Sequence, residues 1–218
     1  MIATICRFML IGAMESEEMR LVVDDLCTSR GGRVIFDGVG FELANGQGLI
    51  VTGPNGAGKS TLLRAIAGYL PVDHGTAKLT PSGNPVWAHA HYLNVLNGLK
   101  GALTVFENLR FHQQFGGVPA ITVEEALDRV GLIHLRDNRF GDLSTGQKRR
   151  VALARLLLNH RPIWLIDEPT TGLDKASEAT FAEIVSDHLN SGGSVVAATH
   201  LPIKVHGVKF LRFEEDTV

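Results

Sequence analysis

The sequence predicts an α/β fold, in which strand–helix units build a sheet and a helical segment of about residues 88–155 is inserted into it. Three apolar runs support this prediction. Gly48–Thr52 leads into a glycine-rich loop and then into Lys59–Tyr69, where apolar residues recur with a helical period. Ile163–Ile166 ends in two acidic residues, and Ser194–Thr199 follows a Gly-Gly turn. Short apolar runs of this kind are typical of buried strands.

The remaining elements follow from alternation, turn residues and capping patterns. Arg20–Leu26 is expected as a strand, and Arg33–Leu43 as two short strands around an Asp-Gly turn. Two capping boxes, in which a hydroxyl residue precedes Glu or Gln by three positions, begin helices at Thr122 and Ser144. The expected helices are Thr104–Phe115, Thr122–Val130, Ser144–Asn159 and Ala176–Leu189, and further strands are expected at Val86–Leu93 and Val208–Phe213.

Length and composition indicate one domain. The chain has 218 residues, 44% of them hydrophobic, and a formal net charge of −2, so no global field draws it to nucleic acid. Its two cysteines form neither a CxxC motif nor a disulfide framework, which suits a reducing cytosol. Residues 1–18 are too short for a membrane span. We expect a disordered leader or a start codon assigned too far upstream, and then a single domain at residues 19–214.

A phosphate-binding loop is predicted between the first buried strand and its helix. The segment Gly53–Ser60 reads Gly-Pro-Asn-Gly-Ala-Gly-Lys-Ser and matches the GxxxxGK[ST] pattern. Its glycines let successive N–H groups point inward, and the following helix adds the positive end of its dipole. Lys59 is expected to reach the β- and γ-phosphates of ATP, and Ser60 to hold Mg²⁺. The nucleotide-binding set expected here is Gly53, Pro54, Asn55, Gly56, Ala57, Gly58, Lys59, Ser60 and Thr61.

Two carboxylates follow the strand predicted at Ile163–Ile166. Asp167 and Glu168 therefore lie at the carboxyl end of a buried strand, where ligands bind in open α/β sheets. Downstream of a phosphate loop, Asp167 is expected to support Mg²⁺ through water. Glu168 is expected to polarise the attacking water as a general base.

A second anion site is predicted at the start of the helix expected at Ser144–Asn159. Ser144 as N-cap and Gly146 in the first turn leave backbone N–H groups free for an anion. A single chain has no evident use for two phosphate sites so far apart in sequence. Two chains packed head to tail would use both sites, because each chain then presses its Ser144 helix onto the γ-phosphate held by the other.

With these motifs in place, the sequence resembles the ABC transporter ATPase family. The phosphate loop, the Leu143–Gln147 signature (LSTGQ), the Asp-Glu strand, the Thr171–Asp174 segment and His200 occur in the order and spacing of that family, over about residues 20–213. The resemblance implies a P-loop ATPase with a mixed β-sheet core plus antiparallel β and helical subdomains. It also implies a homodimer that closes on ATP, hydrolyses it at the interface and reopens.

The family resemblance assigns further roles. His200 contacts the γ-phosphate and orients the water, which makes Glu168, His200 and Lys59 the catalytic set. Asp174 reaches the partner chain's site. The nucleotide is also contacted by the partner's signature residues Ser144, Gly146 and Gln147.

Two positions depart from the family pattern. A glutamine that meets Mg²⁺ and the membrane subunit in relatives aligns with Leu96, which cannot bind a metal, so Leu96→Gln is expected to raise ATPase activity. The position that often stacks an aromatic ring on adenine aligns with Arg30. Its guanidinium plane either stacks on the base or is simply solvated.

Within the family, the sequence is most similar to the ATP-binding subunits of the cytochrome c maturation system. The segments Cys27–Arg30, Leu103–Leu109 and Leu143–Leu156 carry this similarity. It implies a CcmB-like permease partner, a place on the cytoplasmic face of the inner membrane, and energy coupling for haem export or haem release to the periplasm. The surface that receives the permease is expected at Leu103–Phe115, with Phe106 and Phe111 either on it or in the core.

Three other functions compete with this one. They are an ABC transporter subunit for another cargo, a soluble ABC ATPase in repair or translation, and an ATP-gated binding module without hydrolysis. Glu168 argues against the module, since a site that does not hydrolyse ATP needs no base.

Overall fold

A computed structural model describes residues 19–94, 98–199 and 208–213. The predicted leader at residues 1–18 and the positions of Leu96 and His200 lie outside the described residues.

The central sheet has five strands and is parallel in every pair, so the predicted α/β fold is confirmed. Every residue of β6 and of β7 is buried, as expected for strands covered on both faces. In spatial order the strands are β5 (Ala90–Leu93), β6 (Ile163–Asp167), β7 (Ser194–Ala198), β3 (Gly48–Thr52) and β8 (Val208–Arg212).

A second sheet is antiparallel, with β1 (Arg20–Arg30) between β2 (Arg33–Leu43) and β4 (His74–Thr80). The prediction of two short strands at Arg33–Leu43 is wrong. β2 is continuous because its pairing with β1 shifts register three times and so absorbs Gly38 (φ 68°) as an irregularity. The sequence prediction missed β4.

The predicted helices are present, with shifted ends. α1 stops at Ile66 rather than Tyr69, because Gly68 (φ 72°) turns the chain and the Tyr69 N–H bonds back to the Arg64 carbonyl. The strand predicted at Val86–Leu93 begins as a 3₁₀ turn and becomes β5 only at Ala90. The helices are α1 (Lys59–Ile66), α2 (Val105–Phe115), α3 (Val123–Arg129), α4 (Thr145–Leu157) and α5 (Lys175–Asn190).

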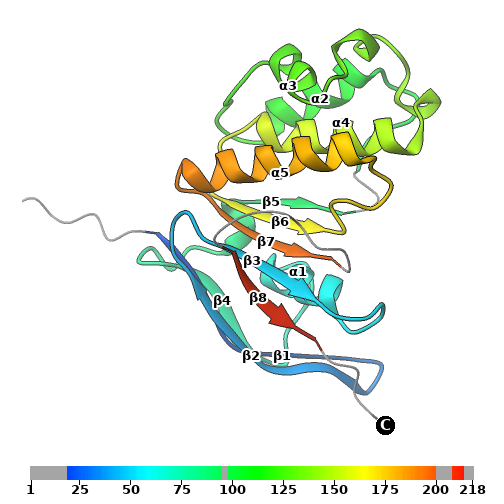
Figure 1. The fold of residues 1–218 in the computed structure, drawn as a ribbon. Coiled ribbons are helices and arrows are strands. Elements are labelled where there is room, and N and C mark those ends of the chain that lie inside the picture. Colours follow the sequence, from blue (N-terminus) through cyan, green and yellow to red (C-terminus); the bar gives the residue numbers. More distant parts are fainter. Residues whose placement is uncertain (1–18, 95–97, 200–207, 214–218) are drawn as a thin grey trace, which may run out of the picture.

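These elements form layers (Figure 1). α2, α3 and α4 gather at one end of the molecule, α5 lies between them and the five-stranded sheet, and the three-stranded sheet is at the other end. Alternate residues of β6 point into two cores. Trp164 and Ile166 face the core shared with α2–α5, whereas Ile163 and Leu165 face the core shared with α1 and the antiparallel sheet.

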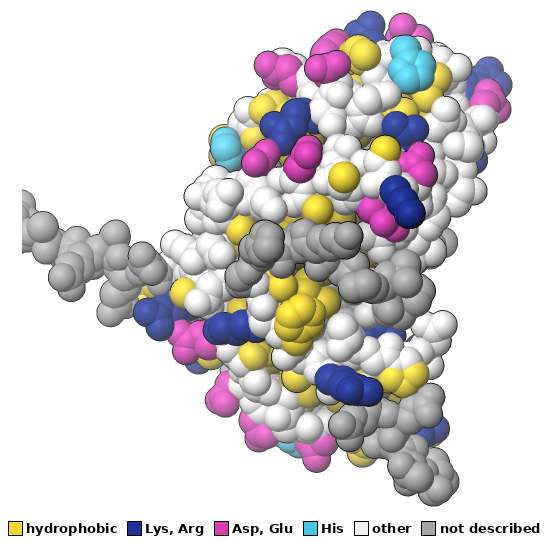
Figure 2. Space-filling view, in the orientation of Figure 1, with side chains coloured by type: hydrophobic (Ala, Val, Ile, Leu, Met, Phe, Trp, Pro, Cys, Tyr) yellow, Lys and Arg dark blue, Asp and Glu magenta, His cyan; other side chains and the backbone are white. Residues whose placement is uncertain are grey.

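The surface is of mixed charge. On the face drawn in Figure 2, basic and acidic side chains are interspersed over the helical end. Among the described residues, no helix is both long and apolar enough to cross a bilayer.

Candidate functional site

The phosphate loop joins β3 to α1, as predicted. Gly53, Gly56 and Gly58 have φ of 143°, 87° and 98°, a region that L side chains rarely adopt. Space is limited as well, because a Cβ on Gly53 would lie 2.5 Å from the carbonyl oxygen of Phe213. Gly58 is the N-cap of α1, so the loop curls directly into the helix N-terminus. This backbone can bind an anion through its N–H groups.

Lys59 is held inside this loop. Its side chain is buried, with 6% exposure, and its Nζ donates to the carbonyl oxygens of Gly53 and Pro54 at 2.8 and 2.7 Å. A rigidly placed ammonium group beside a helix N-terminus provides a fixed positive charge for phosphate. The other expected contacts, Asn55, Ala57 and Thr61, belong to the same loop and the first turn of α1.

Ser60 and Asp167, which are 107 positions apart in sequence, meet in the structure. The Ser60 hydroxyl donates to Oδ1 of Asp167 at 2.8 Å. Burial raises the pKa of Asp167, while the Ser60 hydrogen bond opposes that rise. A hydroxyl and a carboxylate at this distance offer the oxygen ligands that Mg²⁺ prefers, so the residues present fit the predicted metal.

Glu168 has a left-handed backbone, with φ of 50°. For a residue other than glycine this conformation costs of order 1 kcal/mol or more and persists only where the surroundings enforce it. Its N–H donates to the Ala198 carbonyl at 2.8 Å, and Thr171 Oγ1 donates to its Oε2 at 3.3 Å. The carboxylate is thus aimed by a strained turn at the carboxyl edge of the sheet.

Arg149 was missed as a site residue by the sequence analysis. It follows the signature on α4 and is buried, with 5% exposure. Its guanidinium donates to the carbonyl oxygens of Asp167 (2.9 Å), Glu168, Pro169 (3.1 Å) and Asn94 (3.0 Å). Burial lowers the pKa of Arg149 to about 10, so the group stays protonated at neutral pH. One arginine therefore fixes the backbone of both acidic residues.

The signature forms an exposed helix N-terminus. The Ser144 side chain accepts from the Gln147 N–H, and Gln147 Oε1 accepts from the Ser144 N–H, so the predicted capping box is present. A Cβ on Gly146 would lie 3.3 Å from the Gly172 carbonyl oxygen, which places the signature against the segment that ends at Asp174. Asp174 caps α5 by accepting from the Ser177 N–H. In the described part of the chain, no hydrogen bond joins Ser144, Gly146 or Gln147 to the phosphate loop.

Comparison with known proteins identifies the family. A family model described as ABC transporter matches residues 36–171. The chain belongs to the ABC transporter family. It is 55% identical over 194 residues to the cytochrome c biogenesis ATP-binding export protein CcmA of Mesorhizobium japonicum, covering 88% of this chain and 96% of that protein. The corresponding CcmA of Brucella abortus is 51% identical over 191 residues, covering 87% and 89%. Within the family, the chain therefore belongs with the CcmA proteins.

Solved ABC structures have the same fold. A putative ABC transporter ATP-binding protein from Pyrococcus furiosus superposes with a TM-score of 0.77 at 24% identity, over 89% of this chain and 97% of that one. An ATP-binding subunit of another ABC transporter superposes with a TM-score of 0.74 at 25% identity, covering 83% and 79%.

A hollow of about 710 Å³ borders the phosphate loop of this ABC ATPase. It is lined by Asn55–Ala57, by β2 and by the end of β8, and Arg33 and Arg212 are among its residues. The predicted base-stacking residue Arg30 is exposed at the end of β1 and pairs across the hairpin with Arg33. Arg33, which follows Arg30 across a Gly-Gly turn, was not predicted from the sequence as a site residue.

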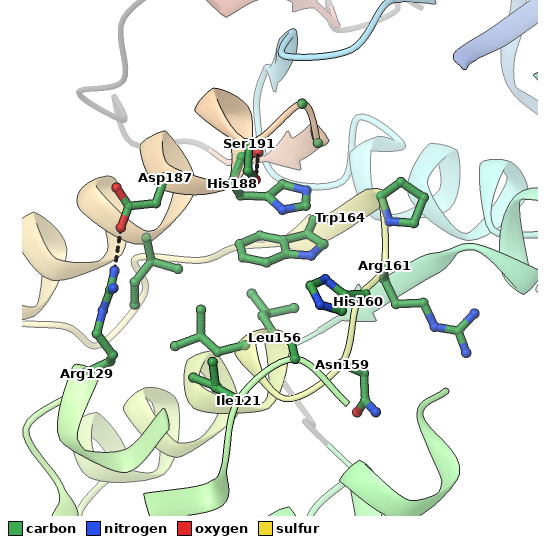
Figure 3. A pocket seen from close by; sticks show the side chains of 16 residues that line it. Ile121, Arg129, Leu156, Asn159, His160, Arg161, Trp164, Asp187, His188 and Ser191 are labelled. Atoms are coloured by element: carbon green, nitrogen blue, oxygen red, sulfur yellow. Dashed lines mark hydrogen bonds and ion pairs between the residues drawn. The ribbon is translucent and has the colours of Figure 1, made fainter. Parts of the chain in front are cut away.

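A second cavity, of about 510 Å³, is separate from this site (Figure 3). Pro162 and Gly193, which line it, precede β6 and β7, whereas the phosphate site is at the other end of those strands. The Trp164 and His188 rings stack at 3.8 Å within it, and a Cβ on Gly193 would collide with the His188 ring at 2.2 Å. Burial lowers the pKa of His188 to about 4, so this histidine is neutral and serves packing.

Proposed function

We propose that this ABC ATPase hydrolyses ATP at sites shared between two copies of the chain and so drives an inner-membrane complex in cytochrome c biogenesis. The contact between Ser60 and Asp167, 2.8 Å long and next to the Lys59 loop, is the observation that carries the catalytic part of this proposal. It joins the two oxygen groups of a metal site to a loop that fits phosphates.

Each residue of the loop has a defined task in this proposal. The N–H groups of Gly53–Ser60 and the ammonium of Lys59 hold the β- and γ-phosphates. Ser60 would hold Mg²⁺ directly and Asp167 would support it through water; when bound, the ion would neutralise phosphate charge. The adenine ring of ATP occupies the hollow beside β2, within reach of Arg30 and Arg33.

Glu168 is placed to act on the attacking water. Its carboxylate follows Asp167 directly, and Thr171 fixes its direction. As a general base it accepts a proton from the water while the γ-phosphate is attacked. His200, which follows β7 in the sequence and lies outside the described residues, completes the set in this proposal.

The second chain supplies the other half of the site. Ser144 is exposed, and its capping box occupies the N–H groups of Ser144 and Gln147, which leaves those of Thr145 and Gly146 in the first turn of α4 for a γ-phosphate. Gly146 has no side chain and therefore lets these N–H groups approach the γ-phosphate closely. Asp174, exposed next to the signature, reaches the partner's site in the same closed dimer.

The permease contact is proposed on α2. Phe111 and Phe115 are exposed (55% and 73%), and their ring centroids are 4.8 Å apart. Phe106, by contrast, packs against the core with Arg136 over its ring at 4.1 Å. In this proposal the chain sits on the cytoplasmic face of the inner membrane, where a CcmB-like permease in that membrane, together with further cytochrome c maturation proteins, would cover the exposed pair. The work performed is haem export or haem release to the periplasm.

Steady-state ATPase activity of Glu168→Gln tests the proposal. Loss of a general base is expected to lower turnover by about 10²–10⁴-fold, while ATP binding is kept and the protein accumulates as an ATP-bound dimer in light scattering. Glu183→Gln, an exposed acid on α5, is the matched control and should behave as wild type. Full activity of Glu168→Gln would refute its role as general base, and a strictly monomeric ATP-bound form in the presence of the permease would refute the shared site.

A further inference from the structure

Three potential metal ligands meet on the antiparallel sheet, away from the catalytic residues. Cys27 of β1, Asp37 of β2 and His74 of β4 place one thiol sulfur, one carboxylate oxygen and one imidazole nitrogen within 4.8 Å of one another. His74 Nε2 is 3.2 Å from an Asp37 oxygen and 3.9 Å from an oxygen of Asp25. The cluster thus draws one donor from each of the three strands and has a further carboxylate at its border.

Irregular pairing of β1 builds this cluster. Cys27 is directly opposite His74, and the register of β1 shifts just before it against both neighbouring strands. Asp25, in the bulge, has a left-handed backbone with φ of 47°. Gly75 (φ 84°) permits the close approach of β4, because a Cβ there would lie 2.1 Å from the Asp25 carbonyl oxygen. The bulge therefore turns Asp25 and Cys27 toward β4 and needs a glycine opposite it.

The donor set fits a borderline-soft divalent ion. Zinc takes thiolate, imidazole and carboxylate at about 2.0–2.3 Å, which puts ligand atoms of a tetrahedral site roughly 3.3–3.8 Å apart. His74 Nε2 is 3.2 Å from an Asp37 oxygen, just below that range, and 3.9 Å from an Asp25 oxygen, just above it. Calcium or magnesium would not select a thiol and an imidazole.

The charge balance also favours a cation. Asp25, Asp37 and Asp73 are the charged groups that surround the Cys27 thiol. No lysine or arginine forms an ion pair with these carboxylates among the described residues. Asp37 and His74 are 65% and 51% exposed on their side chains, which leaves a path from solvent.

We propose that Cys27, Asp37 and His74 bind one zinc ion, with water or Asp25 in the fourth position. The ion clamps β1, β2 and β4 together next to the hollow that Asp37 also lines. The competing interpretation is an Asp–His ion pair over a thiol that serves only packing, and it requires no metal.

Titration of metal-free, tag-free full-length chain with Zn²⁺, and with Co²⁺ as a spectroscopic probe, separates the two interpretations. We expect one ion per chain in calorimetry, and with Co²⁺ a thiolate charge-transfer band together with tetrahedral d–d bands. Zinc should also raise the melting temperature, since a ligand bound only by the folded state stabilises it. The titration uses no nucleotide, so its result is independent of the proposed ATPase activity.

Variants locate the site. His74→Gln and Asp37→Asn, both at exposed positions, should weaken zinc binding by at least about tenfold. Cys27→Ser should remove the charge-transfer band. Cys6→Ser, the other cysteine of the chain, and His134→Gln are matched controls that should change neither. Absence of saturable binding, unchanged affinity in His74→Gln and Asp37→Asn, or a band lost in Cys6→Ser instead would overturn the proposal.

Discussion

Replacement of Arg149 gives the sharpest test of how the site is held. Among the described residues, its guanidinium donates to four carbonyl oxygens from two separate segments, Asn94 and Asp167–Pro169, and it is almost fully buried. Lysine keeps the charge but presents donors from a single nitrogen, so it cannot span these acceptors. Methionine fills the volume and removes every donor.

The expected loss in the free energy of unfolding follows from the number of Arg149 hydrogen bonds that each variant removes. Taking about 1 kcal/mol for each hydrogen bond, Arg149→Met should cost about 4 kcal/mol, and Arg149→Lys, which can keep roughly half of them, about 2 kcal/mol. Domains of this kind are stable by about 5–15 kcal/mol, so the lysine variant should fold and remain measurable. Arg150, its neighbour on α4, makes one long bond to the Val130 carbonyl (3.3 Å). Arg150→Lys is therefore expected to change stability by less than about 0.5 kcal/mol.

Urea unfolding followed by circular dichroism measures these differences. Hydrogen exchange of Asp167 and Glu168 amides should in addition rise in Arg149→Lys but not in Arg150→Lys, because only the first change frees the turn after β6. Equal unfolding midpoints and slopes for the two lysine variants would show that Arg149 does not hold the acidic turn.

Three other perturbations have defined outcomes. Gly53→Ala should abolish ATP binding in a fluorescent-nucleotide titration, because its Cβ would lie 2.5 Å from the Phe213 carbonyl oxygen, while Gly83→Ala, also at positive φ (68°) but with open space around the added Cβ, should keep it. Thr104→Ala removes the capping box of α2 and should lower the free energy of unfolding by about 1 kcal/mol in urea. Burial lowers the pKa of His91 to about 4, below its unfolded value of about 6.5, so the unfolded chain binds the proton more readily. Its contribution, on the order of 3 kcal/mol, is complete above pH 6.5 and is lost as the pH falls toward 4; a stability–pH curve of His91→Gln as steep as that of wild type would contradict this.

The sequence predicted best those features that are contiguous. The phosphate loop is a single stretch between a strand and a helix, so its glycines and Lys59 could be assigned without knowledge of the fold. Capping boxes at Thr104, Thr122 and Ser144 are likewise local, although only the last two were recognised from the sequence.

Features that depend on distant partners were not predictable in this way. β4 (His74–Thr80) is half exposed and contains a glycine that fits only the bulge opposite it, so its own sequence carries no strong strand signal. Arg149 reads as one of several basic residues after the signature. Its role depends on carbonyl groups that the sheet brings to it from 18 to 55 positions away.

Arg149 also connects the helical end of the molecule to the catalytic edge of the sheet. It belongs to α4, whose N-terminus is the exposed signature, while its acceptors include the backbone of both acidic residues. Hydrogen bonds weaken steeply outside about 2.7–3.2 Å, so a shift of α4 relative to β6 by an ångström would break them. Loss of these bonds in the buried site is unfavourable, and the acidic turn is therefore expected to move with α4 as one body. A force applied to the helical end would then reach Glu168 through this arginine.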